Sequence, residues 1–525
     1  MRILVADPIS EQGIERLRQS AQVDVATKLK ESELVEKIRS YDALIVRSET
    51  KVTQKVLEAG RSLKVVGRAG VGVDNIDVEA ATRLGIVVVN APSGNTLAAA
   101  EHTVAMMMAL CRNIPQADAS VRRGEWTRSK FLGVELHDKT LGIIGLGRVG
   151  FEVARIARGL EMHVLAHDPF VSHEKAERLG VQMVSLEELL KRSDFITVHT
   201  PLTDDSRNLI GPDEIELMKP GVRIVNCARG GIVNEAALAD AIVRGKVAGA
   251  ALDVFEHEPV EPTNPLLSLP KVIVTPHLGA STEEAQINVA ISVVESVLAV
   301  LRGELVRDAV NLPRVSAQAL TLLTPYVPLA EKLGKMHAQL LRGQIRRINV
   351  VFSADLGTTE MGPLTSAVLK GFLRSALQDS VNAVNAPIVA RERGIHVSET
   401  LQPPTGSYTS LLEVWVESSE GSQYLAGTLL GKNEPRLVRI DGYVLDAPFA
   451  DHMLLIDHVD RPGVIGKIGT ILGSRDINIS GMQVGRKVVG GDAIMVLGID
   501  MPADKQAIDE IARTPNVISV KVVNF

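Results

Sequence analysis

The sequence predicts an α/β protein with two mostly parallel sheets, followed by a smaller α+β part. Short aliphatic runs alternate with stretches of helical periodicity over residues 3–92 and again over 140–277. Aromatic residues make up only 3% of the chain, so Val, Ile, Leu and Ala must build the core, as in strands buried on both faces. After residue 314 longer β-rich stretches replace this rhythm.

Composition excludes several classes of protein. At about 150 residues per domain, 525 residues indicate three or four domains. With 45% hydrophobic and 23% charged residues, disorder is not the dominant state, and a net charge of −6 gives no support for a nucleic-acid or membrane partner. Cys111 and Cys227 are too few for a disulfide framework or a Cys-rich zinc site, and we expect no metal. No apolar run approaches 18 residues and residues 1–6 are too short for a signal peptide, so we expect a cytoplasmic protein.

The first series reads as five strands separated by helices. The predicted strands are 3–7, 23–27, 43–48, 63–67 and 86–90. Residues 34–38 and 78–84 have helical spacing, and Ser32 and Thr53 stand where N-caps are expected. Residues 96–121 read as one long helix that is apolar on more than one face, which predicts burial between domains or subunits.

The second series continues the same alternation. Its predicted strands are 141–145, 163–167, 195–199, 222–227, 249–254 and 272–275, and a long helix follows over 282–301.

The C-terminal third is predicted to be mostly antiparallel. Expected strands are 347–354, 411–417, 424–430 and 437–444, with helices over 365–377 and 380–393. Residues 453–525 read strand–helix–strand–strand–helix–strand, which is the ferredoxin-like order. Those strands are 454–459, 477–484, 493–499 and 518–523, and the two helices begin near Gly463 and Ala503.

A glycine-rich turn predicts a dinucleotide site in the second series. Gly145, Gly147 and Gly150 follow a strand and open a helix, which allows a tight turn, a close approach to pyrophosphate and close helix packing. Asp168 ends the next strand at the spacing of a ribose-binding acid. A carboxylate there would repel a 2′-phosphate, so NAD is favoured over NADP. The alternative is a glycine turn in a domain of this fold that binds no nucleotide.

Three charged residues follow the carboxyl ends of predicted strands, where open α/β sheets bind ligands. Arg229 suits a carboxylate through two parallel hydrogen bonds, His277 suits proton transfer, and Glu258 can orient an imidazole. Each residue alone also fits a surface or capping role. Together, behind a dinucleotide fold, they predict oxidation of a secondary alcohol by hydride transfer.

Residues 1–310 resemble the D-isomer-specific 2-hydroxyacid dehydrogenases. The resemblance rests on five ordered segments, VGRAGVGVDN at 66–75, VHTP at 198–201, NCARGG at 226–231, ALDVF at 251–255 and TPHLGA at 275–280. It implies that Arg229 clamps the substrate carboxylate, Glu258 orients and His277 is the acid/base. It also implies that NAD contacts the glycine loop and Val71, Arg148, Val149, Asp168, Thr200, Cys227, Ala228, Arg229, Asp253, His277, Gly279 and Ala280.

The resemblance further implies a nucleotide domain of Rossmann type inserted into a flavodoxin-like substrate domain. The expected boundaries are 1–93 with 281–313 for the substrate domain, 94–280 for the NAD domain, 314–450 for an α+β intervening domain and 451–525 for an ACT regulatory domain. Long-form members act on D-3-phosphoglycerate, which is trianionic. Arg47, Ser48, Arg68, Gly70 and Asn95 are the expected substrate residues, and Arg128 and Lys130 either reach a neighbouring subunit or are solvated loop charges.

The tail is similar to the ACT signature over 460–468 and 476–480. That likeness implies L-serine as an effector, with Asp460 taking its ammonium and Asn478 hydrogen-bonding to the amino acid; a dimerising ACT unit without ligand is the alternative. Residues 443–450 contain no Arg, Lys or His, so we expect no strong anion site in that stretch of the intervening domain. A homodimer or homotetramer is expected.

Two other functions stay open. One is reduction of another 2-keto acid, such as 2-oxoglutarate or glyoxylate. The other is an NAD-sensing binding protein without turnover. The ACT-like tail favours the biosynthetic enzyme, because amino-acid feedback suits the first step of a pathway.

Overall fold

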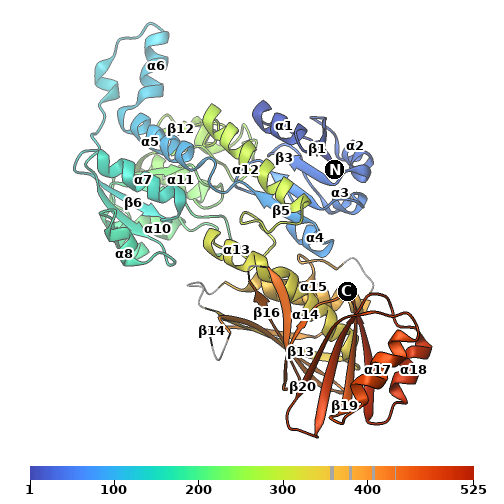
Figure 1. Ribbon diagram of the computed structural model, residues 1–525. Helices are drawn as coiled ribbons and strands as arrows, with labels where there is room; N and C mark the ends of the chain where they lie inside the picture. The colour runs from blue at the N-terminus through green and yellow to red at the C-terminus, as the bar shows by residue number, and fades with distance from the viewer. Residues whose placement is uncertain (355–359, 378–380, 405–407, 432) are drawn as a thin grey trace.

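A computed structural model describes residues 1–354, 360–377, 381–404, 408–431 and 433–525. Four sheets organise these residues. In Figure 1 the two sheets of the first 310 residues lie side by side above, and the two C-terminal sheets lie below them.

The first sheet is parallel, with strand order β2-β1-β3-β4-β5. This order is flavodoxin-like, as the fold class predicts. Its strands are β1 (Arg2–Val5), β2 (Gln22–Val25), β3 (Ala43–Val46), β4 (Val65–Arg68) and β5 (Val87–Asn90). Its helices are α1 (Glu11–Arg18), α2 (Glu31–Lys37), α3 (Gln54–Ala59) and α4 (Val78–Arg83), with a short 3-10 turn η1 (Ile38–Ser40).

Helix α12 (Glu283–Leu301) returns from much later in the chain to cover this sheet. Gly67 allows the approach, because a Cβ there would lie 2.7 Å from the Val297 side chain. Among the described residues α12 alone has the length and hydropathy of a membrane span. Val293, Val294 and Val297 are fully buried in the core, so α12 is an interior helix of this layer.

The second sheet has the order β12-β11-β10-β9-β6-β7-β8, the doubly wound arrangement of Rossmann type. Its strands are β6 (Thr140–Ile144), β7 (His163–His167), β8 (Gln182–Met183), β9 (Phe195–Val198), β10 (Val222–Asn226), β11 (Val247–Leu252) and β12 (Val272–Val274). Its helices are α7 (Arg148–Gly159), α8 (His173–Glu177), α9 (Leu186–Arg192), α10 (Pro212–Leu217) and α11 (Glu235–Val243), and η3 (Pro265–Ser268) precedes β12. The two-residue β8 was not predicted, because it contains no aliphatic run.

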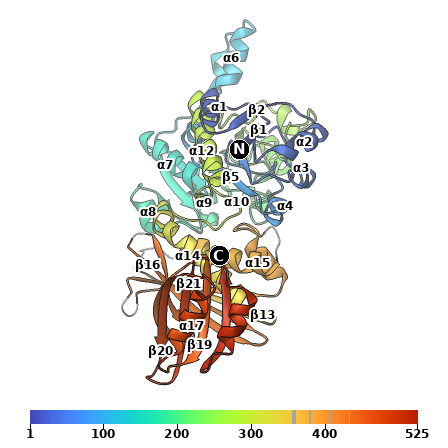
Figure 2. The ribbon, with the colours of Figure 1, turned by 45° about the vertical axis from the view of Figure 1, so that its right-hand side comes forward.

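The predicted long helix 96–121 is two helices, α5 (Thr96–Arg112) and α6 (Ile114–Arg122). Asn113 breaks it with a left-handed φ of 52°, and Pro115 lacks the N–H that would bond to the Cys111 carbonyl. That carbonyl accepts from the Val134 N–H at 3.0 Å instead. Helix α5 is buried against the second sheet, whereas α6 projects with the segment around η2 (Arg128–Phe131) as an arm (Figures 1 and 2).

The third sheet has the order β14-β13-β15-β16-β17-β18. Its strands are β13 (Ile345–Ala354), β14 (His396–Gln402), β15 (Ser410–Ser418), β16 (Gly421–Leu430), β17 (Glu434–Ile440) and β18 (Tyr443–Pro448). Its helices are α13 (Ala317–Leu323), α14 (Val327–Leu340), α15 (Gly362–Leu377) and α16 (Ala386–Glu392), with η4 (Thr324–Tyr326) before α14.

Two expectations for this region were wrong, and several elements were not predicted. The predicted strand 437–444 is a hairpin, because Asp441 and Gly442 turn the chain with φ of 45° and 87°. Edge strand β14 was missed, and it pairs with β13 in parallel. Helices α13 and α14 were also missed, although Leu329, Leu333 and Met336 are buried at helical spacing. The predicted helix 380–393 begins at Ala386, and residue 380 lies outside the described residues.

The fourth sheet has the ferredoxin-like order β20-β21-β19-β22. Strands β19 (His452–Val459), β20 (Ile479–Arg486), β21 (Asp492–Ile499) and β22 (Val517–Asn524) carry α17 (Val464–Gly473) and α18 (Lys505–Ala512) on one face. The other face shares one hydrophobic core with the third sheet and α14, through Met453, Leu455 and Val523. Lys332 of α14 lies over the rings of Phe449 and Phe525, which are 5.4 Å apart.

Candidate active site

The glycine-rich turn between β6 and α7 has the form that a dinucleotide requires. Gly145 has a φ of 92°, and a Cβ there would lie 2.8 Å from the His199 carbonyl. A Cβ on Gly150 would lie 2.1 Å from the Gly145 oxygen, whereas one on Gly147 would meet nothing within 4 Å. The first and third glycines therefore close the turn, and the second leaves open space at the start of α7. No side chain caps that helix, so its first N–H groups are available to a pyrophosphate.

Asp168 lies against this turn, one residue beyond β7. Its carboxylate accepts the N–H of Leu146 at 2.8 Å and that of Phe170 at 2.8 Å. The Thr200 hydroxyl next to the turn is buried without a partner among the described residues, which fits a site that a polar ligand completes. Val149 packs into the core below, and the Arg148 guanidinium donates to the Pro92 carbonyl at 3.1 Å. These residues fit NAD.

A cavity of about 550 Å³ lies between the first and second sheets. It brings together the predicted residues Arg47, Ser48, Arg68, Gly70, Val71, Asn95, Arg229, Glu258, His277 and Ala280. Ile9, Ser10 and Gln286 also line it and were not predicted from the sequence. They come from the segment before α1 and from the first turns of α12, and no motif marks them.

His277 and Glu258 form a hydrogen-bonded pair on the wall of this cavity. Glu258 Oε2 lies 2.7 Å from His277 Nδ1, and Glu258 Oε1 accepts the Phe255 N–H at 3.1 Å. Partial burial would raise the pKa of Glu258, but the hydrogen bond and charge of His277 bring that pKa below its usual range. An ionised carboxylate at this distance favours the proton on Nδ1, which leaves Nε2 free to accept one.

Three arginines face the same cavity. The Arg229 Nη1 donates to the Ala228 carbonyl at 2.7 Å, and its Nε lies 3.8 Å from Asp74 Oδ2, a largely exposed carboxylate. Burial and repulsion by Arg229 lower the pKa of Arg68 to about 10, and its buried Nε has no partner in the part of the chain that the structure describes. A cation in this condition is suited to an anionic ligand, which would restore both its hydrogen bond and its charge balance.

Two buried polar residues that were not predicted from the sequence hold the backbone at two of these arginines. Asp7 accepts the N–H of Arg47 at 2.6 Å and the N–H of Thr50 at 3.1 Å. Asn226 donates from Nδ2 to the Arg229 carbonyl at 2.9 Å and accepts the Ala228 N–H at 3.0 Å. Both stand at strand ends, so the rule that found Arg229 could have found them as well.

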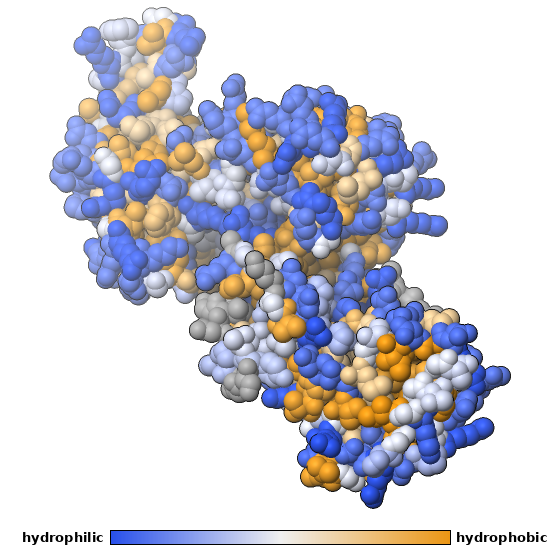
Figure 3. Space-filling model, in the orientation of Figure 1, coloured by the Kyte–Doolittle hydropathy of each residue, from blue (hydrophilic) through white to orange (hydrophobic). Residues whose placement is uncertain are grey.

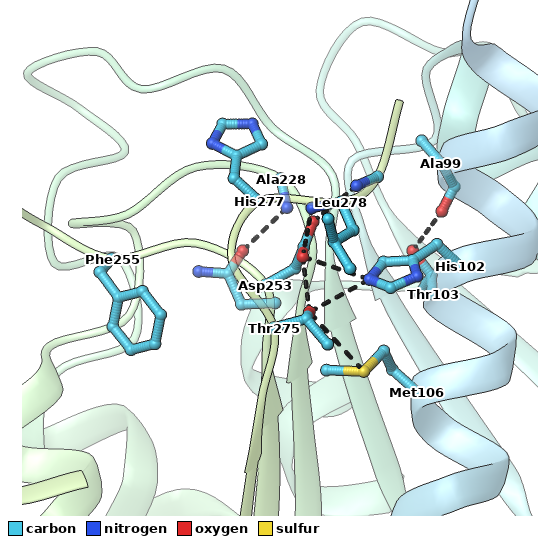
Figure 4. Close-up of polar contacts among 12 residues, drawn as sticks. Ala99, His102, Thr103, Met106, Ala228, Asp253, Phe255, Thr275, His277 and Leu278 are labelled. Atoms are coloured by element: carbon cyan, nitrogen blue, oxygen red, sulfur yellow. Dashed lines mark hydrogen bonds and ion pairs between the residues drawn. The ribbon is translucent and has the colours of Figure 1, made fainter. Parts of the chain in front are cut away.

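Asp253 was expected at the cofactor, but its carboxylate is fully buried beneath the loop that carries His277 (Figure 4). It accepts the hydroxyl of Thr275 at 2.6 Å and the N–H groups of Leu278 and Gly279 at 2.7 and 2.8 Å. Burial would raise its pKa, but these bonds and one from His102 lower it. Burial and the Asp253 charge raise the pKa of Cys227 to about 12, so that thiol stays neutral.

The remaining predicted residues lie away from the cavity. Arg128 and Lys130 are exposed on the arm, where the Arg128 guanidinium lies over the Trp126 ring. In the fourth sheet Asp460 accepts from Arg486 at 3.1 Å and from the Gly490 N–H at 3.2 Å. Asn478 donates to Asp500 at 2.7 Å.

Comparison with known proteins gives the site its context. Three family models match in order: the NAD binding domain of D-isomer specific 2-hydroxyacid dehydrogenases at residues 104–279, the D-3-phosphoglycerate dehydrogenase intervening domain at 322–441 and the ACT domain at 452–516. A D-3-phosphoglycerate dehydrogenase of Archaeoglobus fulgidus is 49% identical, with 100% of both chains covered. That of Bacillus subtilis is 44% identical over 100% of this chain and 99% of its own.

The chain belongs to the D-3-phosphoglycerate dehydrogenase family.

Solved structures resemble a little over half of this D-3-phosphoglycerate dehydrogenase family member. The TT0316 protein of Thermus thermophilus is 35% identical with a TM-score of 0.55, and the match covers 59% of this chain and 100% of that one. A D-lactate dehydrogenase of Aquifex aeolicus complexed with NAD and lactic acid is 30% identical with a TM-score of 0.52, covering 58% and 96%. The predicted fold class, dehydrogenase class and NAD cofactor are confirmed.

Proposed function

We propose that the chain is an NAD-dependent dehydrogenase that oxidises D-3-phosphoglycerate to 3-phosphohydroxypyruvate, the first committed step of L-serine biosynthesis. One observation carries the proposal. The His277–Glu258 pair and the three arginines Arg47, Arg68 and Arg229 line a single cavity. A trianionic hydroxy acid needs several cations and one base, and this cavity holds both.

The residues divide the work as follows. Arg229 binds the substrate carboxylate and polarises the adjoining oxygen, and Arg47, Ser48 and Arg68 receive the phosphate. Nε2 of His277 accepts the hydroxyl proton, and Glu258 stabilises the imidazolium that forms. When bound at the glycine turn, NAD supplies the hydride acceptor, and Asp168 receives its ribose hydroxyls. The predicted domain boundaries belong to the same proposal, and α12 on the first sheet supports a substrate domain built from both ends of residues 1–310.

Self-association is also proposed, as a homodimer or homotetramer. On the arm Ile114 and Val121 are about half exposed, and Trp126 and Leu132 are 74% and 90% exposed. Apolar side chains also gather on the C-terminal lobe that carries α17 and α18 (Figure 3). Both surfaces suit a second copy of the chain. Regulation by L-serine at the ACT unit and a cytoplasmic location complete the proposal, and two free cysteines agree with a reducing compartment.

The test is NADH oxidation with 3-phosphohydroxypyruvate, with and without millimolar L-serine, beside 2-oxoglutarate and glyoxylate. Turnover of the phosphorylated acid that serine suppresses is the expected result. Turnover that ignores serine would leave the dehydrogenase and make the tail an assembly unit. Turnover of another keto acid alone would overturn the substrate, and NADH binding without turnover would point to a binding protein.

A further inference from the structure

We infer that His102 of α5 is a positioning residue that holds the catalytic loop through Asp253. The kinetic test of this inference rests on the proposed function, whereas the hydrogen-exchange test does not. His102 Nε2 lies 3.2 Å from Asp253 Oδ1 and 3.2 Å from the Thr275 hydroxyl. No motif in the sequence marks this histidine, which is not among the residues that line the cavity, and Figure 4 shows it on α5 pointing toward Asp253 and Thr275.

The neighbouring hydrogen bonds show that His102 is the donor in its contacts with Asp253 and Thr275. The Thr275 hydroxyl gives its only proton to Asp253 at 2.6 Å, so its oxygen offers His102 a lone pair. The other neighbour is a carboxylate oxygen, which also accepts. His102 Nε2 therefore carries a hydrogen in either charge state of the ring, and the histidine is a donor that completes a buried anion.

Asp253 is the anchor of the loop that presents His277. The N–H of His277 donates to the Asp253 carbonyl at 2.9 Å, and the next two N–H groups end on its carboxylate at 2.7 and 2.8 Å. His277 has a φ of 55°, a conformation that side chains other than glycine seldom adopt. The loop keeps this conformation because consecutive N–H groups converge on one residue. A shift of the Asp253 carboxylate would move His277 relative to Glu258 and the arginines.

His102 reaches this anchor from the helix that follows the first sheet. Helix α5 starts six residues after β5 and packs against the second sheet, so it bridges the two walls of the cavity. The Thr103 hydroxyl donates to the Ala99 carbonyl at 2.8 Å, within the same helix, and contributes nothing to the loop. Met106 of the same helix also approaches the loop, with its Sδ 3.9 Å from the Thr275 hydroxyl, whereas His102 contacts both Asp253 and Thr275 at 3.2 Å.

The experiment compares three variants of the full chain. His102→Leu removes the donor, His102→Gln can restore an N–H at a similar reach, and Glu101→Gln alters the exposed neighbour on the same helix. His102→Leu should lower kcat for 3-phosphohydroxypyruvate reduction by about tenfold to a hundredfold, because a displaced base loses its alignment. KM should change by less than about threefold, since the arginines are untouched. His102→Gln should recover most of kcat, and Glu101→Gln should match the wild type.

Hydrogen exchange gives a readout that needs no substrate. In His102→Leu the amides of residues 277–279 should exchange about tenfold faster, while strand β6 keeps its protection. Equal loss of protection in β6 would mean global destabilisation, and unchanged exchange over 277–279 or an unchanged kcat would overturn the inference. Failure of His102→Gln to recover any kcat would do the same. If the wild type turns over no keto acid, the proposed function fails, and exchange over 277–279 still decides the role of His102.

Discussion

The cavity between the first two sheets and the ACT loop, meaning the chain around Asp460 and Asn478, are both predicted to bind small charged molecules, but their polar groups differ in whether they already have partners. In the cavity Arg68 is partly buried, its Nε has no hydrogen-bond partner among the described residues, and a second arginine beside it repels its charge. In the ACT loop Asp460 is bonded to Arg486 and to the Gly490 N–H, and Asn478 is bonded to Asp500. The cavity therefore contains a hydrogen-bond donor that a ligand can still satisfy, whereas the polar groups of the ACT loop already have partners within the chain.

This difference predicts how strongly each site should respond to a ligand or to a substitution. A buried group without a partner costs stability, so a fold that keeps one gains from the ligand that satisfies it. When a polar group already has a partner, a ligand must replace that partner, so the ligand gains only the difference between the two interaction free energies. We therefore expect strong effects from changes in the cavity and weak effects in the ACT loop.

The largest effect should come from His277→Gln. Loss of the base should lower kcat by about a hundredfold to ten-thousandfold, because general base catalysis supplies about that factor. Stopped-flow and steady-state NADH oxidation would measure it. Glu258→Gln, which keeps the side chain but removes the charge that fixes the imidazole, should lose less. Near-normal turnover of His277→Gln would show that another group is the base. The expectation that changes in the cavity have the largest effects would then be wrong.

The next effect should come from Arg68→Met. We expect kcat/KM to fall by about ten- to a hundredfold, the usual worth of a hydrogen bond to a charged group. The melting temperature should stay level or rise, because a partly desolvated cation is removed whose Nε has no hydrogen-bond partner among the described residues. Thermal unfolding without ligand measures the second half of the prediction. Arg302→Ala, an exposed arginine paired with Glu304, is the control. A lower melting temperature for Arg68→Met would show that Arg68 stabilises the fold. The cavity would then not contain a cation that costs stability in the absence of ligand.

Asp168→Ala should have a smaller effect, confined to the cofactor. We expect NAD to bind about tenfold more weakly, since hydrogen bonds to one charged acceptor are lost. Fluorescence titration with NADH measures this. Asp168→Asn keeps an acceptor for the Leu146 N–H and separates loss of charge from loss of the turn. If both variants bind NADH as tightly as the wild type, the ribose assignment is wrong.

The smallest effect should come from Arg486→Ala. Releasing Asp460 should strengthen inhibition by L-serine about two- to fivefold, the worth of an exposed ion pair. Dose–response curves of NADH oxidation measure it, with Arg475→Ala as the control because Arg475 pairs with Glu510 in the same unit. A loss of serine response in Arg486→Ala would assign Arg486 to the effector site and end the contrast between the two regions.

The site was predictable from the sequence where chemistry coincides with strand ends. Arg229, Glu258 and His277 follow buried strands, so the topology that predicts the sheet also brings these residues together. His102 and Gln286 were missed because a helix position carries no comparable signal, and their roles depend on which helices cross the cavity. Asp253 was placed at the cofactor by resemblance, and its burial by four donors depends on a loop conformation that no spacing specifies.

The fold was predictable where the aliphatic pattern is strong. All strands of the first sheet were found, because each falls in an aliphatic run between helices, although β2 itself is only partly buried. Errors gather where local chemistry interrupts a pattern, as at Asn113 and Pro115, or where the Asp441–Gly442 turn divides an apolar stretch. Edge strand β14 is mostly exposed, so no apolar run marks it.

The core that α14 shares between the third and fourth sheets has a consequence for engineering this chain. Residues 451–525 are a poor cassette for domain exchange, because Met453, Leu455 and Val523 belong to the same apolar interior as Leu329 and Leu333. A graft that replaces only these residues would expose one apolar face of α14 to solvent, and the chimaera would be prone to self-association through that face. A transplant of residues 314–525 as one piece would keep this shared interior intact, although Val384 and Asn382 would lose their contacts with the first sheet.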